Sequence, residues 1–159
     1  MEKLGSFYRD NKRTLFAYLM RMTGDYYLAG DIMQESFTRY LERYDGQAPN
    51  ASLLFTIARN AIFDHSRNRK RNVHLSEDPI DSSGSQEYDL MIKQEYRQVI
   101  GAMQKLEKNE RDILALAISD GLSYRDIAAI VDISVENVKV KVHRTRLKLK
   151  KILQRGDQS

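Results

Sequence analysis

The 159-residue sequence predicts an all-α protein made of two small helical domains joined by a flexible linker. Apolar residues recur every three or four positions along most of the chain, which is the period of a helix with one buried face. Only two prolines and eight glycines interrupt this pattern, and no segment alternates strictly between apolar and polar residues as a half-buried strand would. A polar, acidic segment divides the helical pattern into two parts.

The first 44 residues predict two helices. Leu15, Leu19 and Met22 recur at helical spacing, and a second series of apolar residues begins at Leu28. The break between them is Thr23-Gly24-Asp25. Gly24 suits the left-handed position just after a helix, and the Asp25 carboxylate can cap the helix that follows.

A second break, over residues 45–50, contains Pro49 and precedes a third helix. Asn50 is a suitable cap for that helix, which is expected to run to about Arg71. These three helices form the predicted first domain, residues 1–75. Residues 76–90 are acidic and rich in serine, with too few apolar side chains to fold, and are predicted to be the flexible linker.

The predicted second domain covers residues 91–159. Its first helix is expected to start at Tyr88, in the last residues of the linker, and to end at Leu106. A shorter helix follows, with Asn109 as its expected cap and Gly121 as its end. Ser123 can cap the next short helix, and a three-residue turn then leads to Ser134, which can cap a longer one. A short helix, a tight turn and a longer helix make a helix-turn-helix, whose second helix enters the DNA major groove.

A helical wheel of the last helix places Val135, Val138, Val142, Leu149 and Leu153 on the buried side. The opposite side carries residues suited to reading base edges and others suited to holding phosphates. The predicted readers are Glu136, Asn137, Val140 and Arg144, and the predicted phosphate contacts are Lys139, Lys141 and Lys148. The alternative for the charges from Arg146 to Arg155 is a solvated basic face.

The charge distribution also indicates a polyanionic partner. The net charge of +4 divides into +4 over residues 1–75, −5 over 76–95 and +5 over 96–159. Two positive surfaces on one chain suggest a nucleic acid touched at two places, although basic faces are frequently only solvated. On the third helix, Phe63 lies among cations, where its ring could stack on an unpaired base or pack on a neighbouring helix.

Several classes of function find no support in the sequence. The chain contains no cysteine, which excludes disulfides, thiolate nucleophiles and cysteine zinc sites. There is no phosphate-binding loop or hydrolase elbow, and the carboxylates of Asp31 and Glu35 have no histidine nearby in sequence. We therefore expect no enzyme, no metal site and no cofactor. No apolar run is long enough to span a membrane, so a cytoplasmic protein without membrane insertion is expected.

Together these motifs resemble the extracytoplasmic-function (ECF) sigma factors, the minimal sigma-70-type initiation factors of bacteria. The resemblance covers about Leu4 to Leu153. The matching segments are Thr23-Gly24-Asp25, Asp31-x-x-Gln34-Glu35-Ser36-Phe37, Thr56-Ile57-Ala58-Arg59-Asn60 with Asp64 and Arg67, and Gly121-Leu-Ser-Tyr-Arg-Asp-Ile-Ala with Val138-Lys139 and His143-Arg144.

The resemblance implies a region-two domain that binds the β′ clamp helices of core RNA polymerase and melts and reads the −10 promoter element. It also implies a region-four domain that reads the −35 element, with the β subunit as a further partner. Matching positions assign polymerase binding to Asp31, Gln34, Glu35 and Phe37, with a place in the core as the alternative for Phe37. They assign −10 recognition to Arg59, Asn60, Asp64, Arg67 and Lys70, and capture of a flipped base to the loop over residues 45–50. Region-four recognition falls on Lys139, Val140, Lys141 and Arg144, in agreement with the wheel.

Family members are controlled by anti-sigma factors, so such a partner is expected, with a monomeric free protein that joins the nucleoid in the holoenzyme. DNA binding by the free protein is expected to be weak, because a flexible tether would leave the spacing of the two domains undefined. Two departures from the family pattern stand out. Gly30 replaces a usual Glu, and Leu106-Glu107 replaces Leu-Pro, so that the helix there could run on. The alternative functions are an autonomous helix-turn-helix regulator and a sigma-like decoy.

Overall fold

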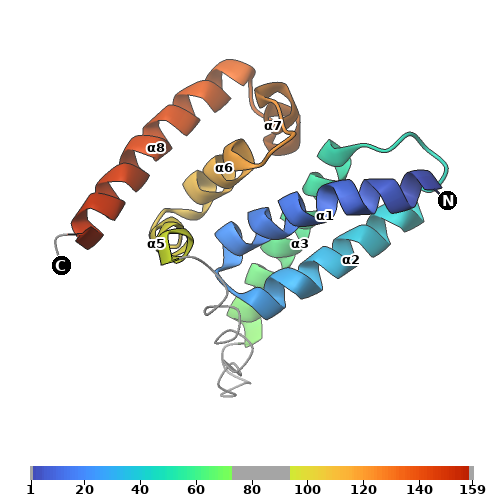
Figure 1. Cartoon of the computed structure of the whole chain (residues 1–159), viewed down its shortest axis with the longest axis horizontal. Coiled ribbons are helices and arrows are strands. Elements are labelled where there is room, and N and C mark those ends of the chain that lie inside the picture. The colour runs from blue at the N-terminus through green and yellow to red at the C-terminus, as the bar shows by residue number, and fades with distance from the viewer. Residues whose placement is uncertain (1, 73–93, 158–159) are drawn as a thin grey trace.

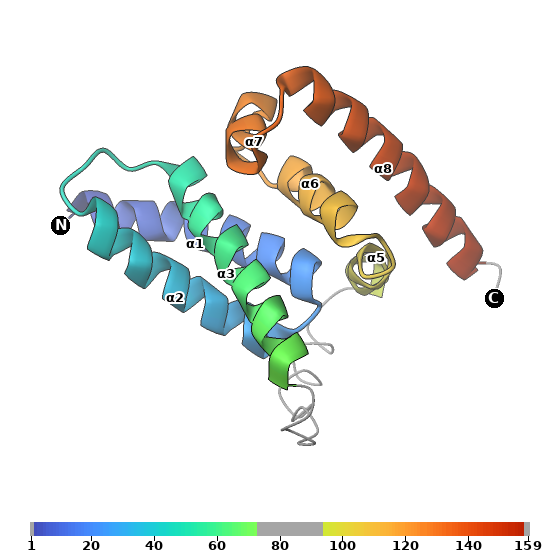
Figure 2. The same cartoon turned by 180° about the vertical axis from the view of Figure 1, so that it is seen from behind.

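The computed structural model describes residues 2–72 and 94–157, and within this part every regular element is a helix. Helices α1, α2 and α3 pack together in the N-terminal half, and α5 to α8 in the C-terminal half (Figures 1 and 2). Their bounds are α1 Glu2–Thr23, α2 Tyr26–Tyr44, α3 Ala51–Asn72, α5 Gln94–Met103, α6 Lys108–Ile118, α7 Tyr124–Val131 and α8 Val135–Asp157.

The caps predicted for the N-terminal bundle are present. Gly24 has a φ of 66°, in the left-handed region that glycine adopts without strain. The Asp25 carboxylate accepts hydrogen bonds from the backbone N–H groups of Tyr27 and Leu28, both at 3.1 Å. The Asn50 side chain accepts one from Leu53 at the start of α3. These caps set where α2 and α3 begin, and the buried faces of the three helices then meet in one core.

The helix-turn-helix also forms as predicted. The Ser123 hydroxyl accepts a hydrogen bond from the Asp126 N–H at the start of α7, and Ser134 accepts one from Asn137 at the start of α8. Between the two helices Asp132 adopts a φ of 60°, which makes the turn tight. On α8, Val138 and Val142 are buried as expected, and Thr145 continues the buried side. Val135, Leu149 and Leu153 are only half-buried.

Three predicted boundaries in the C-terminal half are wrong. The cap of α6 is Glu107 rather than Asn109, and the helix ends at Ile118, before Gly121. Helix α5 also stops at Met103 instead of running on through Leu106. Arg111 stabilises the turn between α5 and α6, because its guanidinium donates hydrogen bonds to backbone carbonyls that the helix leaves unpaired where it ends. The predicted start at Tyr88 lies outside the described residues.

The two halves pack against each other, so the expectation that their spacing is undefined is wrong. Helix α1 lies against α5 and α6, and α3 lies against α7. Buried apolar residues of both halves form one continuous cluster. Helix α8 lies on the side of α6 and α7 that faces away from the N-terminal bundle (Figures 1 and 2). The predicted linker, residues 76–90, lies outside the described residues, as do both of its boundaries.

Candidate functional site

The outward face of α8 is open along its first half. The side chains of Glu136, Asn137, Lys139, Lys141 and Arg144 are all exposed. Val140, on the same face, is 45% exposed. The structure therefore brings these six predicted DNA contacts together on one surface, with polar tips near the start of the helix and cations around them. This arrangement suits a helix that enters a groove between phosphates.

Lys148 differs from the other predicted contacts on α8. Its ammonium forms an ion pair with the carboxylate of Glu110, on α6. Hydrogen bonding to Glu110 raises the pKa of Lys148 above its ordinary value. The side chain is thus directed toward its own domain, and a DNA phosphate would have to compete with Glu110 for it.

The predicted polymerase-facing residues of α2 divide into exposed and buried ones. Asp31 and Gln34 are exposed, and Glu35 is half-buried and pairs with Arg39 at 2.5 Å. Phe37 is only 7% exposed, and its ring centroid lies 4.7 Å from that of Tyr8 on α1. Of the two possibilities for Phe37, the structure therefore shows the second, because its ring belongs to the core of the bundle and does not face a partner.

The predicted −10 face of α3 is only partly open. Asn60 and Arg67 are exposed, and the Arg67 guanidinium lies 2.5 Å from the half-buried Asp64. Arg59 instead points toward the C-terminal half, where its Nε donates to the carboxylate of Asp112 at 2.6 Å. The side chain of Lys70 lies outside the described residues.

Phe63 packs beside a neighbouring helix, the second of the two possibilities considered for it. Two cations lie over its ring, with the Arg59 guanidinium 4.6 Å and the Lys108 ammonium 4.3 Å from the ring centroid. Lys108 opens α6 in the other half of the chain. The packing of the two halves therefore covers two neighbouring side chains of the α3 face, Arg59 and Phe63.

The loop between α2 and α3, residues 45–50, is exposed throughout. It is held at its end by a hydrogen bond from the Asn50 backbone N–H to the Tyr40 hydroxyl, at 2.9 Å. Tyr40 is itself almost fully buried. The loop thus projects from a fixed base, next to the first turn of α3.

A buried polar cluster joins the two halves. Both carboxylate oxygens of Asp112 are engaged, because Oδ1 accepts from the Tyr18 hydroxyl at 2.7 Å and Oδ2 accepts from Arg59 at 2.6 Å. Asp112 is 2% exposed and Tyr18 is fully buried. Burial, and then the neighbouring carboxylate of Asp112, raises the pKa of Tyr18 well above its ordinary value. The cation of Arg59 offsets the cost of burying the Asp112 charge.

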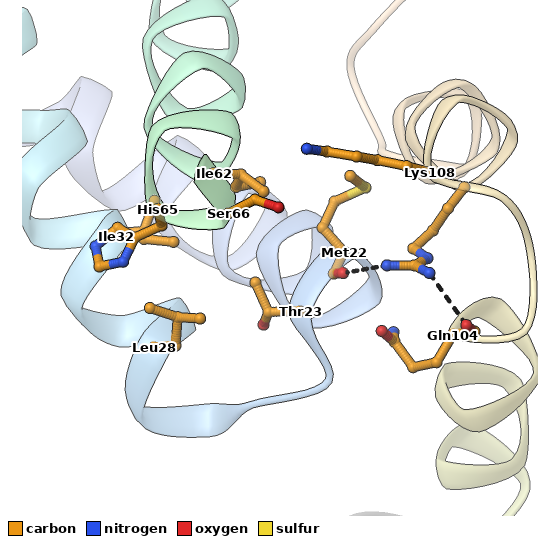
Figure 3. A pocket seen from close by; sticks show the side chains of 10 residues that line it. Met22, Thr23, Leu28, Ile32, Ile62, His65, Ser66, Gln104 and Lys108 are labelled. Atoms are coloured by element: carbon orange, nitrogen blue, oxygen red, sulfur yellow. Dashed lines mark hydrogen bonds between the residues drawn. The ribbon is translucent and has the colours of Figure 1, made fainter. Parts of the chain in front are cut away.

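A second set of polar contacts joins the halves at the end of α1, beside a cavity of about 400 Å³ (Figure 3). The Gln104 side-chain amide donates to the Arg21 carbonyl at 2.8 Å, and the Arg111 guanidinium donates to the Met22 carbonyl at 3.0 Å. These two carbonyls have no partner further along their own helix. The cavity is open to solvent and lined by residues of both halves, among them Leu28, Ile62 and His65.

No motif or periodicity in the sequence singles out Tyr18, Gln104, Arg111 or Asp112. One signal was available in the apolar run of α6, where Asp112 directly precedes Ile113 and Leu114 on a helix that is otherwise buried there. An acidic residue at such a position needs a partner, but a single sequence does not show which cation lies opposite it.

Within the described residues no group of histidine, aspartate and glutamate is arranged to hold a metal ion. None of the described helices combines the length and the apolar character needed to cross a bilayer.

Two family models match the chain, one to each half. Residues 7–72 match the model for sigma-70 region 2, and residues 96–149 match the model for sigma-70 region 4. The first match contains α2, most of α1 and all of α3, and the second contains α6, α7 and the outward face of α8. Both candidate DNA-facing surfaces thus fall inside matched regions.

Curated relatives match nearly the whole chain. The ECF RNA polymerase sigma factor SigM of Bacillus subtilis is 34% identical over 147 residues, covering 89% of this chain and 90% of the relative. The ECF RNA polymerase sigma factor EcfG of Rhodopseudomonas palustris is 31% identical over 143 residues, covering 88% and 79%.

Solved structures share the fold. The sigma factor RpoE of Bartonella quintana, in complex with the anti-sigma factor NepR, superposes with a TM-score of 0.70 at 21% identity, covering 94% of this chain and 97% of that one. CnrH in complex with the cytosolic domain of CnrY gives a TM-score of 0.69 at 22% identity, covering 95% and 87%.

Proposed function

The chain belongs to the ECF sigma factors of the sigma-70 family, and from this premise we propose that it binds core RNA polymerase, directs it to promoters and assists DNA melting. The observation that carries the proposal is the placement of two polar, cation-bearing faces on separate halves of one chain. One is the outward face of α8, and the other is the face of α3 around Asn60. When two linked domains bind two short DNA elements together, their affinities combine, so neither domain needs a large interface with DNA.

The −35 element is assigned to α8. Arg144 is placed to donate to a guanine edge, Asn137 and Glu136 to contact bases near the helix start, and Val140 to meet a thymine methyl. Lys139 and Lys141 flank this row and suit phosphates. Lys148 is assigned a weaker phosphate contact, because Glu110 already binds its ammonium.

The −10 element is assigned to α3 and the loop before it. Asn60 and Arg67 are exposed and free to approach an opened strand, whereas Asp64 positions Arg67 through their ion pair. Arg59 and Lys70 complete the proposed set. The exposed loop over residues 45–50 is proposed to receive a base flipped from the stack.

Core polymerase binding is assigned to the exposed face of α2, with Asp31 and Gln34 as direct contacts and Glu35 at its edge. Phe37 supports that face from inside the bundle. Region two is assigned to residues 1–75 and region four to 91–159, with 76–90 between them. The β′ clamp helices and the β subunit are the proposed polymerase surfaces.

Both solved structures of the same fold contain a second protein, which in the RpoE complex is named as an anti-sigma factor. We extend this to the present chain and propose regulation by an anti-sigma factor. A cytoplasmic monomer that joins the nucleoid within the holoenzyme, and that acts without catalysis or cofactor of its own, completes the proposal.

The test is transcription by purified bacterial core polymerase from a library of random promoter-sized DNA, with and without this protein. Transcripts that require the protein and share two spaced elements are expected. Asn60→Ala should impair promoter opening more than polymerase binding, which a footprint of the melted region and a pull-down of core polymerase measure separately. Equal loss of both would contradict the assignment of Asn60.

Two other results would replace the proposal. Binding to core polymerase without any transcript would identify a decoy. Tight binding to a single DNA site without polymerase, together with no binding to core, would identify an autonomous regulator.

A further inference from the structure

The contact between the two halves engages the same arginine that the proposed function assigns to the −10 element. Arg59 lies on the DNA-facing side of α3, one residue before Asn60, yet its guanidinium is bound to Asp112 of α6. Only 22% of the Arg59 side chain remains exposed, and 3% of the Asp112 side chain. A promoter strand cannot reach Arg59 through this contact.

Both carboxylate oxygens of Asp112 bind side chains of the N-terminal half. One carboxylate oxygen accepts from the Tyr18 hydroxyl of α1 and the other from Arg59 of α3, so one side chain of the C-terminal half holds two helices of the N-terminal half. No buried polar side-chain atom in the described residues lacks a hydrogen-bond partner. The contact is thus fully satisfied, as a defined interface requires.

The chemistry at Arg59 resembles that of DNA binding. A carboxylate and a phosphate both offer anionic oxygens to a guanidinium, and charge-assisted hydrogen bonds of this kind are among the stronger ones in proteins. Phe63 is covered on the same side, because its ring lies against Lys108 of α6. Both side chains would be released together if α6 moved away from α3.

We propose that the free chain is held in a closed state by Asp112, whose carboxylate occupies at Arg59 the position of a DNA phosphate, and that promoter DNA must displace it. This inference rests on the proposed function for the identity of the competitor. Tyr18 contributes by fixing the carboxylate from the other side. The outward face of α8 stays open in this state, so closure withholds Arg59 and Phe63 of the −10 face and leaves the −35 face available (Figures 1 and 2).

The full-length chain offers a direct measurement of closure. It contains no cysteine, so Glu42→Cys on α2 and Gln154→Cys on α8 place two fluorophores at exposed positions, one in each half. Single-molecule energy transfer then reports the ratio of closed to open molecules. Asp112→Asn keeps the size of the side chain and an acceptor for Tyr18 but removes the charge that holds Arg59.

The matched control is Asp120→Asn. Asp120 follows α6 in the same half of the chain and is exposed, and the chemical change is the same. Both substitutions raise the net charge by one, so any general attraction to DNA changes equally. Removing a charge-assisted bond is expected to raise the open-to-closed ratio about tenfold in Asp112→Asn, and Asp120→Asn should leave it unchanged.

The second readout is the concentration of unlabelled protein that gives half-maximal transcription with core polymerase. It should fall in Asp112→Asn and not in Asp120→Asn, since a larger open fraction raises apparent affinity. Tyr18→Phe removes one of the two bonds to Asp112 and should shift both readouts in the same direction. It provides an independent test should Asp112→Asn fail to fold, as judged by its circular dichroism.

Closure by Asp112 is refuted if the wild-type chain is predominantly open, or if Asp112→Asn and Tyr18→Phe leave the energy transfer unchanged while the wild type transcribes. In that case the sigma factor function stands. The opposite pattern, a shift in energy transfer with no transcription by any variant, would refute the proposed function and the role of DNA as competitor, and would support the closed state.

Discussion

Replacing Arg111 by methionine should lower the free energy of unfolding by about 3 kcal/mol, which is a large part of the stability of a small protein. The Arg111 guanidinium donates hydrogen bonds of 2.9 to 3.0 Å to four backbone carbonyls. They belong to Met22 at the end of α1 and to Met103, Gln104 and Leu106 around the turn between α5 and α6. Arg111 therefore fixes the turn and joins it to the other half of the chain.

The magnitude follows from the number and the exposure of these bonds. A hydrogen bond from a charged donor contributes about 1.5 to 3 kcal/mol, so four of them set an upper bound of roughly 6 to 12 kcal/mol. Arg111 is half-buried, so water can replace part of what is lost, and methionine retains most of the apolar stem. About 3 kcal/mol remains, equivalent to a fall of roughly 6 to 12 °C in Tm for a chain of this length.

Urea denaturation followed by circular dichroism measures the effect. Arg125→Met on α7 is the matched control, because Arg125 is exposed, and it should change the unfolding free energy by less than about 0.5 kcal/mol. Arg111→Lys should fall between the wild type and Arg111→Met, since a compact ammonium cannot reach carbonyls on several sides at once. A loss below about 1 kcal/mol in Arg111→Met, or full stability in Arg111→Lys, would refute the reasoning.

Three further predictions concern the faces and the buried contact. Gly30→Glu should bind core polymerase more tightly than Gly30→Ala in a pull-down titration, because the position has free space for a side chain. The alanine variant accounts for the gain of about 1 kcal/mol in helix propensity, so the difference between the two variants reports the charge. Equal binding by both variants would remove Gly30 from the polymerase surface. Arg144→Ala should weaken recognition of the −35 element by about 1 to 3 kcal/mol in competition binding to holoenzyme, whereas a uniform loss across sequences would show a phosphate contact. Because burial raises the pKa of Tyr18 in the folded state, the unfolded chain releases this proton first, so its contribution to stability is complete below about pH 10 and is lost as the pH rises further. Tyr18→Phe should therefore show a shallower loss of unfolding free energy above pH 10, and an unchanged slope would contradict the assignment.

Local chemistry in the sequence was sufficient for most of the fold. Asp25, Asn50, Ser123 and Ser134 act as caps where they were expected, because a cap is recognised from its own side chain and the few residues that follow. The outward face of α8 could be predicted for the same reason, since helical periodicity alone separates Val138 from Arg144.

Contacts distant in sequence could not be found this way. The partners of Asp112 are 94 and 53 residues away, and no pattern in one sequence connects them. The end of α5 was misplaced because the side chain that binds its carbonyls, Arg111, comes from the next helix. Phe37 shows a different difficulty, since a motif position indicates that a residue matters but not whether it faces a partner or the core.

The open side of α8 has a consequence for how such a protein diversifies. Because Glu136, Asn137 and Arg144 contact little of their own molecule, exchanges at these positions leave the folded state almost unaffected. A duplicated copy could acquire a new set of target genes through a few such changes, without compensating substitutions elsewhere. Arg59 has no such freedom, since it is constrained by Asp112 as well as by any nucleic acid. Among descendants, residues of α8 that select the −35 element should therefore change faster than residues of α3 that act at the −10 element.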